Sequence, residues 1–70
     1  MTQPEKLLMD LVEKNGEGKS ISILSELSYV NCNYNYESDD YLQAHTIHSI
    51  AIESNLFNYD EKAQKVYLNK

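Results

Sequence analysis

Arginine is absent from this sequence of 70 residues, and no cationic side chain occurs between Lys19 and Lys62. All six cations are lysines. Because arginine is the side chain that grips phosphate and guanine edges with paired hydrogen bonds, its absence argues against a surface built to hold nucleic acid. The formal net charge of −5 and a pI near 4.7 also disfavour non-specific attraction to nucleic acid or anionic lipid. A protein partner with a basic surface fits this charge better.

The chain also has little that could cross-link it, export it or insert it into a bilayer. Its one cysteine, Cys32, cannot form an internal disulfide, and residues 1–4 lack the basic and apolar regions of a secretory signal. We therefore expect a cytoplasmic protein without a membrane role. Residues 1–70 are long enough for one small domain, which buries only roughly 60% of its unfolded surface, so a homodimer would be a natural supplement to its stability.

The first predicted helix begins at Pro4 and ends at Asn15-Gly16, since proline suits a first turn and both closing residues tolerate a left-handed C-cap. Its apolar residues share one stripe: Leu7, Leu8, Leu11 and Val12. Residues 17–19 are predicted to be a loop.

A second helix follows, with Ser20 or Ser22 as its N-cap. Its apolar face is predicted to hold Ile23, Leu24, Leu27 and Val30. Residues 31–37, which we call the Tyr/Asn segment, follow this helix. They disfavour helix formation, because asparagine side chains compete for backbone hydrogen bonds. Apolar residues alternate with asparagines there, so residues 31–37 could be a loop or an edge strand.

The third helix is predicted to start at the N-cap Ser38, with Asp39 and Asp40 in its first turn, and to run to about Asn55. Its inward arc is predicted to contain Tyr41, Ala44, Ile47, His48, Ala51 and Ile52. Its outward side is predicted to contain Gln43, Thr46, Ser49, Ile50 and Glu53. Two period-two segments around a polar turn, residues 56–59 and 65–68, then predict a β-hairpin. The predicted class is α+β, a three-helix bundle with a C-terminal β-hairpin.

This order of elements resembles the winged helix-turn-helix superfamily. The resemblance is carried by Glu5–Asn15 with Gly16, by "SILSELS" (Ser22–Ser28), and by "ESNLFNYDEKAQKVYLN" (Glu53–Asn69), which looks like a recognition helix running into a wing. The segment of about seven residues between the second and third helices departs from the three or four that the motif normally uses.

The resemblance implies that the third helix would enter the major groove of DNA while the wing touches phosphates. In that interpretation Gln43, Asn55 and Thr46 would read bases, and Lys62 and Lys65, together with Lys70, would hold the phosphate backbone. Acidic residues beside the helix would repel the phosphate backbone of the DNA. A dimeric transcriptional regulator that contacts DNA through its wing lysines is therefore the alternative, and the lysines could equally be solvated turn charges.

The Tyr/Asn segment is the preferred candidate for a binding surface, because tyrosine offers a large amphipathic contact and asparagine adaptable hydrogen bonds. Tyr34 and Tyr36 would anchor a partner, while acidic side chains meet its cations: Glu37, Asp39, Asp40 and Glu53. The competing interpretation is that the two tyrosines close the core of a small domain.

No metal, cofactor or catalytic site is expected. His45 and His48, with Cys32 and an aspartate nearby, fit no standard ligand spacing, and His48 falls in the apolar arc, where a core histidine is commoner. Cys32 and His45 could be a nucleophile and base, but nothing supplies an orienting third group.

The sequence thus favours a small acidic module that binds a protein. Its size and acidity resemble inhibitors from phages and mobile elements that occupy a basic nucleic-acid-binding surface of a partner. An interaction or dimerisation module from a larger assembly is a further alternative.

Overall fold

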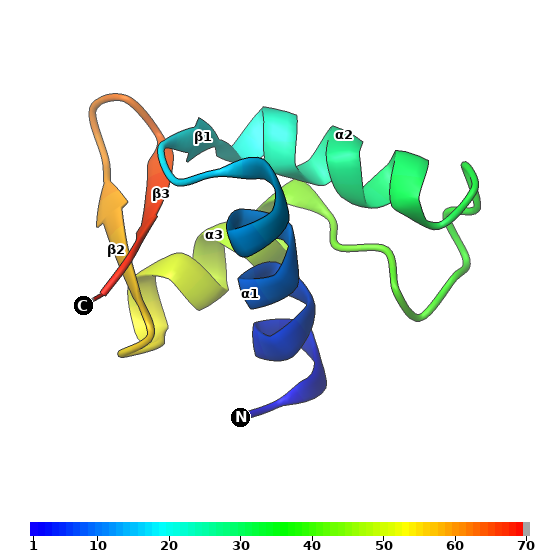
Figure 1. Cartoon of the computed structure of the whole chain (residues 1–70), viewed down its shortest axis with the longest axis horizontal. Helices are drawn as coiled ribbons and strands as arrows, with labels where there is room; N and C mark the ends of the chain where they lie inside the picture. The colour runs from blue at the N-terminus through cyan, green and yellow to red at the C-terminus, as the bar shows by residue number, and fades with distance from the viewer. Residues whose placement is uncertain (70) are drawn as a thin grey trace.

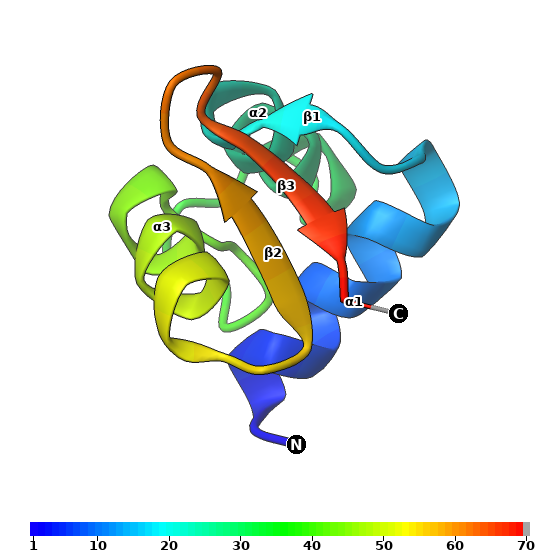
Figure 2. The ribbon, with the colours of Figure 1, turned by 90° about the vertical axis from the view of Figure 1, so that its left-hand side faces the viewer.

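The computed structural model describes residues 1–69 and has the predicted α+β class, a helical bundle with a C-terminal hairpin. Its elements are α1 (Gln3–Asn15), β1 (Lys19–Ser20), α2 (Ile21–Asn31), α3 (Ala44–Glu53), β2 (Phe57–Asp60) and β3 (Lys65–Leu68). The strands form an antiparallel sheet in the order β1-β3-β2, at one end of the molecule in Figure 1 and facing the viewer in Figure 2. Within residues 1–69, every helix falls short of the length and apolar character that crossing a bilayer requires.

Helix α1 begins and ends close to where the sequence predicts. Thr2 Oγ1 accepts a hydrogen bond from Glu5 N, and Glu5 Oε1 accepts one from Thr2 N, so the two residues form a capping box. Gly16 ends the helix with φ 97°, a left-handed value that glycine adopts without strain. The predicted stripe is confirmed, because Leu8, Leu11 and Val12 are buried and Leu7 packs against them.

The sheet contains one strand more than the predicted hairpin. The hairpin itself is confirmed, with Phe57 opposite Leu68 and Asp60 opposite Lys65. Of the loop predicted at residues 17–19, residues 17 and 18 are irregular as expected, but Lys19 pairs with Val66 of β3. A strand of two residues is too short to show an alternating pattern, so β1 has no signature in the sequence.

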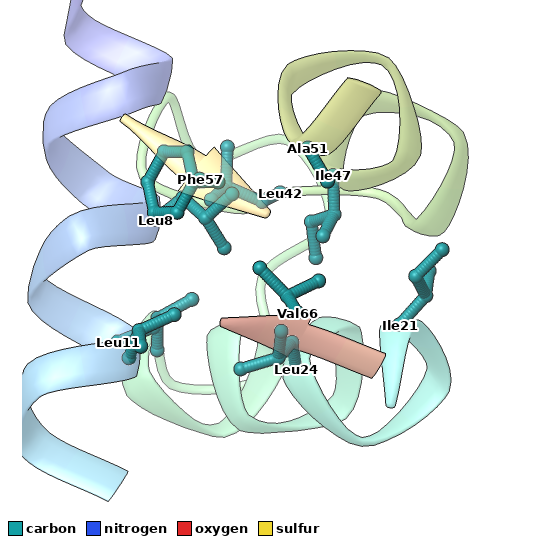
Figure 3. Close-up of a cluster of buried hydrophobic side chains, with 10 residues drawn as sticks. Leu8, Leu11, Ile21, Leu24, Leu42, Ile47, Ala51, Phe57 and Val66 are labelled. Carbon is teal, nitrogen blue, oxygen red and sulfur yellow. The ribbon is translucent and has the colours of Figure 1, made fainter. Parts of the chain in front are cut away.

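One apolar core joins the three helices to the sheet (Figure 3). Every element except β1 contributes to it, and so does the segment before α3: Leu8, Leu11, Val12, Ile21, Leu24, Leu42, Ile47, Ala51, Phe57 and Val66. Burying each of the larger side chains contributes about 1.5–3 kcal/mol. The core thus fixes the directions in which α2 and α3 present their remaining faces.

Between α2 and α3 the chain is held by a buried serine. Ser28 of α2 is 1% exposed, and its Oγ accepts a hydrogen bond from Leu42 N (2.7 Å) and donates one to Asp40 O (3.2 Å). Leu42 itself enters the core. We call residues 32–43 the turn segment, because it consists of turns and extended residues without helix or strand.

The predicted start of the third helix at Ser38 is wrong. Ser38 Oγ accepts from Asp40 N two residues on, and Ser38 O accepts from Tyr41 N, so the chain makes a tight turn there. The bonds to Ser28 then keep the next residues extended, and the helix starts after Gln43, its N-cap. Tertiary contacts therefore override the local capping signal, and Asp39 and Asp40 lie in the turn segment. The helix also ends at Glu53, before the predicted Asn55.

The predicted faces of α2 and α3 are partly wrong. In α2 the buried residues are Ile21, Leu24 and Ser28, while Ile23 and Val30 are about half exposed. In α3 Ile47 and Ala51 are buried, as predicted, but Thr46 and Ile50 are half-buried. The exposed residues of this helix are Ala44, His45, His48, Ser49, Ile52 and Glu53. The inward face of α3 is thus rotated towards Ile50 because the helix packs against α1 as well as the sheet.

A chain of hydrogen bonds joins the start of α1 to the end of α3. Ser54, the C-cap of α3, donates its hydroxyl to Glu5 Oε2 (2.7 Å) and accepts from Leu56 N (3.2 Å). Bonds from Thr2 and Ser54 to the charged carboxylate lower the pKa of Glu5 from 4.5 to about 2.

We predict that Ser28→Ala lowers the free energy of unfolding by about 1–3 kcal/mol, because it leaves the buried Leu42 N–H without its acceptor. Ser22→Ala, at an exposed position of the same helix, is the control and should change it by less than about 0.5 kcal/mol. Urea unfolding followed by circular dichroism measures both. Equal midpoints for the two variants would contradict the anchoring role of Ser28.

The Glu5 bonds predict acid sensitivity. Because the folded-state pKa of Glu5, about 2, lies below its ordinary 4.5, its carboxylate stabilises the fold above about pH 4.5, and this contribution is lost as the pH falls towards 2. Glu5→Gln should lower the melting temperature at neutral pH. It should also reduce the fall in melting temperature between about pH 4.5 and pH 2. Glu13→Gln, an exposed position of the same helix, should keep the wild-type decline in thermal melts.

Candidate functional site

Four tyrosines gather where α2 meets the turn segment, and we call them the tyrosine cluster: Tyr29, Tyr34, Tyr36 and Tyr41. Tyr29, in the last turn of α2, is the centre. Tyr36 stacks on it with ring centroids 4.8 Å apart and planes at 22°, and Tyr34 meets it edge-on at 5.2 Å and 86°. Tyr41 completes the cluster at 5.4 Å from Tyr29.

The backbone that carries the cluster is held by local hydrogen bonds. Asn33 and Tyr34 have left-handed backbones, with φ of 59° and 60°, and Tyr34 N donates to Tyr29 O. Cys32 Sγ lies 3.2 Å from the carbonyl oxygens of both Tyr29 and Asn35, which share its single S–H as acceptors. These bonds reverse the chain directly after α2 and return Tyr36 to Tyr29. The edge-strand alternative for residues 31–37 is thereby excluded, and the loop is observed.

Tyr34 and Tyr36 do not close the core. They remain 64% and 70% exposed, and the core lies on the other side of α2, where Leu24 and Ser28 are buried. Tyr29 and Tyr41 are half-buried. The two anchoring residues predicted from the sequence are therefore the open rim of a cluster whose base is formed by Tyr29 and Tyr41.

The acidic residues of the turn segment lie beside the cluster. Glu37 and Asp39 are exposed, and Glu37 N donates to Asn35 Oδ1, which fixes the turn that follows Tyr36. Asp40 is exposed as well, but it also lines a cavity of about 70 Å³ with Asp10 and Lys14 of α1. Glu37 and Asp39 are thus the acidic residues best placed to act together with the rings.

Glu53 does not join this surface. It ends α3 and lines a cavity of about 350 Å³ with Glu5 and Ser54, near the start of α1. Figure 1 shows the end of α3 at the lower left of the molecule and the turn segment at the far right. Of the predicted partner-binding residues, the structure therefore brings together those of the turn segment and separates Glu53 from them.

The residues predicted to contact DNA are scattered. Lys62 and Lys65 are exposed on the hairpin, and Gln43 is exposed at the start of α3. Thr46 is half-buried and lines the cavity against α1, so it lies away from the outward face. That outward face carries histidines in place of lysine or arginine. Lys70 lies outside the described residues.

The histidines are placed differently from the prediction. His48 is exposed and meets Tyr59 of β2 edge-on, with ring centroids 5.2 Å apart, so the expected core histidine is wrong. Cys32 is tied to backbone carbonyls at the end of α2. Within residues 1–69, no three histidine, cysteine, aspartate or glutamate side chains converge as a metal ion would require.

Sequence reasoning missed Tyr29 and Tyr41 as members of the site. The available signal is composition: four of the six tyrosines fall within residues 29–41. Tyr29 was overlooked because its neighbours predict helix, and Tyr41 because it was assigned to the inward arc of α3. Neither assignment shows that the chain reverses and brings these rings together.

Comparisons with protein-family models, with curated proteins and with solved structures found no match to this chain. The function must therefore be argued from the site alone.

The cluster changes the acidity of its central ring. A hydrogen bond with the Tyr36 side chain, together with burial and the neighbouring ionisable groups, raises the pKa of Tyr29 from 10 to about 12. The neutral form of Tyr29 therefore stabilises the fold below about pH 10, and this contribution is lost as the pH rises through 12.

We predict that Tyr36→Phe lowers the pKa of Tyr29 towards 10, because the ring stays while its hydroxyl is lost. The measurement is a pH titration of the Tyr29 ring-carbon signal by NMR, with amide signals as the check on folding. Tyr67→Phe, on β3 and outside the cluster, should leave the Tyr29 titration unchanged. A Tyr29 pKa near 10 in the wild type would contradict the contact.

Proposed function

We propose that this protein acts by binding another protein through the tyrosine cluster and the acidic residues beside it, Glu37 and Asp39. The observation that carries the proposal is the open pair of rings, Tyr34 and Tyr36, held against Tyr29 by stacking and by backbone bonds. Exposed aromatic surface of this kind is typical of binding hot spots. Because the rings are already positioned, little side-chain entropy is lost when a partner binds.

Charge supports a basic partner. The turn segment contains acidic residues and tyrosines but no lysine or arginine of its own. Lys14 of α1 lines a cavity with Asp40, so Glu37 and Asp39 are the acidic residues on which the proposal depends. Such a surface attracts lysine- and arginine-rich proteins and repels phosphate backbones. In this proposal the carboxylates take the place of phosphates on a partner that normally holds nucleic acid, as an inhibitor from a phage or mobile element would.

In this proposal the resemblance to winged helix-turn-helix domains is one of architecture, without their DNA-reading surface. It rests on the order of three helices followed by the β2-β3 hairpin. The helix that would read DNA, however, exposes histidine, serine, alanine, isoleucine and glutamate side chains, with no lysine or arginine among them. A protein-binding role therefore uses the end of the molecule opposite the hairpin (Figure 1).

We predict that the double variant Glu37→Lys, Asp39→Lys weakens binding of a short peptide of alternating arginine and lysine by about tenfold or more, because two attractions become repulsions. The matched control is Glu53→Lys, Glu61→Lys, which changes the net charge equally at the other end of the molecule (Figure 1). The control should keep most of the wild-type affinity. Isothermal titration calorimetry measures binding, and the melting temperature reports folding.

Equal loss of affinity in the two double variants would show a response to net charge alone and would contradict the proposed surface. The alternative, DNA binding through Lys62 and Lys65, is examined with mixed-sequence duplex DNA at low and at raised salt. Retention at low salt that falls steeply with added salt would favour that alternative. Absence of retention even at low salt is the result that our proposal expects.

A further inference from the structure

The open side of the tyrosine cluster is a flat ring with two acidic residues close by in the sequence. Tyr36 lies nearly parallel to Tyr29, at 22°, and is still 70% exposed, so one face is covered by Tyr29 and the other is open. Glu37 follows Tyr36 directly, and its backbone N–H donates to Asn35 Oδ1, which fixes the turn that carries both residues. Asp39 is exposed in the next turn.

A planar cation fits an open aromatic face with acidic residues nearby better than a spherical cation does. A guanidinium group can lie flat on an aromatic face and still direct its N–H groups sideways to carboxylates, because its donors lie in its own plane. An ammonium group is more strongly hydrated and offers no plane to stack. A stacked base would also match the ring, but the phosphates attached to it would meet Glu37 and Asp39.

We propose that the outer face of Tyr36 accepts an arginine side chain of the partner, with Glu37 and Asp39 as acceptors for the guanidinium edge. This inference rests on the proposed function, because it identifies the partner residue that the same surface recognises. The guanidinium becomes the third layer of a stack that begins with Tyr29 and continues with Tyr36. The partner surface is therefore rich in arginine, the residue that this chain itself lacks.

Two peptides of equal length and charge provide the test, one alternating arginine with glycine and the other lysine with glycine. The wild-type protein should bind the arginine peptide about fivefold more tightly, since one stacking contact on an exposed ring contributes on the order of 1 kcal/mol. Tyr36→Leu should remove most of this preference, and Tyr36→Phe should retain it because the ring face remains. Tyr67→Leu, an exposed tyrosine of the sheet, should leave the preference unchanged.

Calorimetry gives both affinities, and NMR shifts of the Tyr36 ring signals show where the peptide lies. Equal affinities for the two peptides, still sensitive to Glu37→Lys, Asp39→Lys, would overturn the arginine inference and leave the proposed function standing. A preference for arginine that survives Tyr36→Leu would overturn the stacking geometry. Failure of both peptides to bind the folded wild type would overturn the proposed function as well.

Discussion

The hydroxyl of Ser28 determines where the candidate site lies. By accepting from Leu42 N and donating to Asp40 O, it fastens the far end of the turn segment to the middle of α2. Leu42 can then enter the core, and the residues before it must turn back along the helix. That return is what brings Tyr36 and Tyr41 onto Tyr29. If these bonds were absent, the acidic residues would be free to form the first turn of a longer helix, and the rings would lose their common base.

The parts of the fold that local sequence determines were predictable. The stripe on α1, the glycine after it, and the two period-two segments of the hairpin each follow from short-range geometry that the chain expresses without help from distant residues. The serine N-cap of α2 belongs with them, since Ser20 Oγ accepts from Ile23 N as expected. In contrast, β1 exists through its pairing with β3, and no local pattern marks it.

The site could be predicted only in part, because two of its determinants are tertiary. Tyr34, Tyr36, Glu37 and Asp39 were recognisable from composition, since tyrosines alternate with asparagines there and acidic residues follow directly. Tyr29 was not, because it belongs to a regular helix and gains its role only when the chain reverses. The wrongly predicted start of α3 at Ser38 also results from a tertiary contact that the local sequence does not show. Ser38 followed by two aspartates is a strong local cap, but the anchored Leu42 outweighs it, since a buried apolar side chain and a satisfied buried N–H together contribute more than one cap.

The same anchoring sets the charge of the turn segment apart from that of the hairpin. Glu37 and Asp39 lie on the turn segment, whereas Lys62 and Lys65, at the opposite end, are accompanied by Asp60 and Glu61 (Figure 1). A basic partner is therefore attracted more strongly to the turn segment than to the hairpin, so it approaches in an orientation that presents its cations to the tyrosines. Charge attraction alone is weak at exposed sites and is screened by salt. The positioned rings supply the contact that salt does not weaken, so the aromatic and acidic parts of the surface are effective together rather than separately.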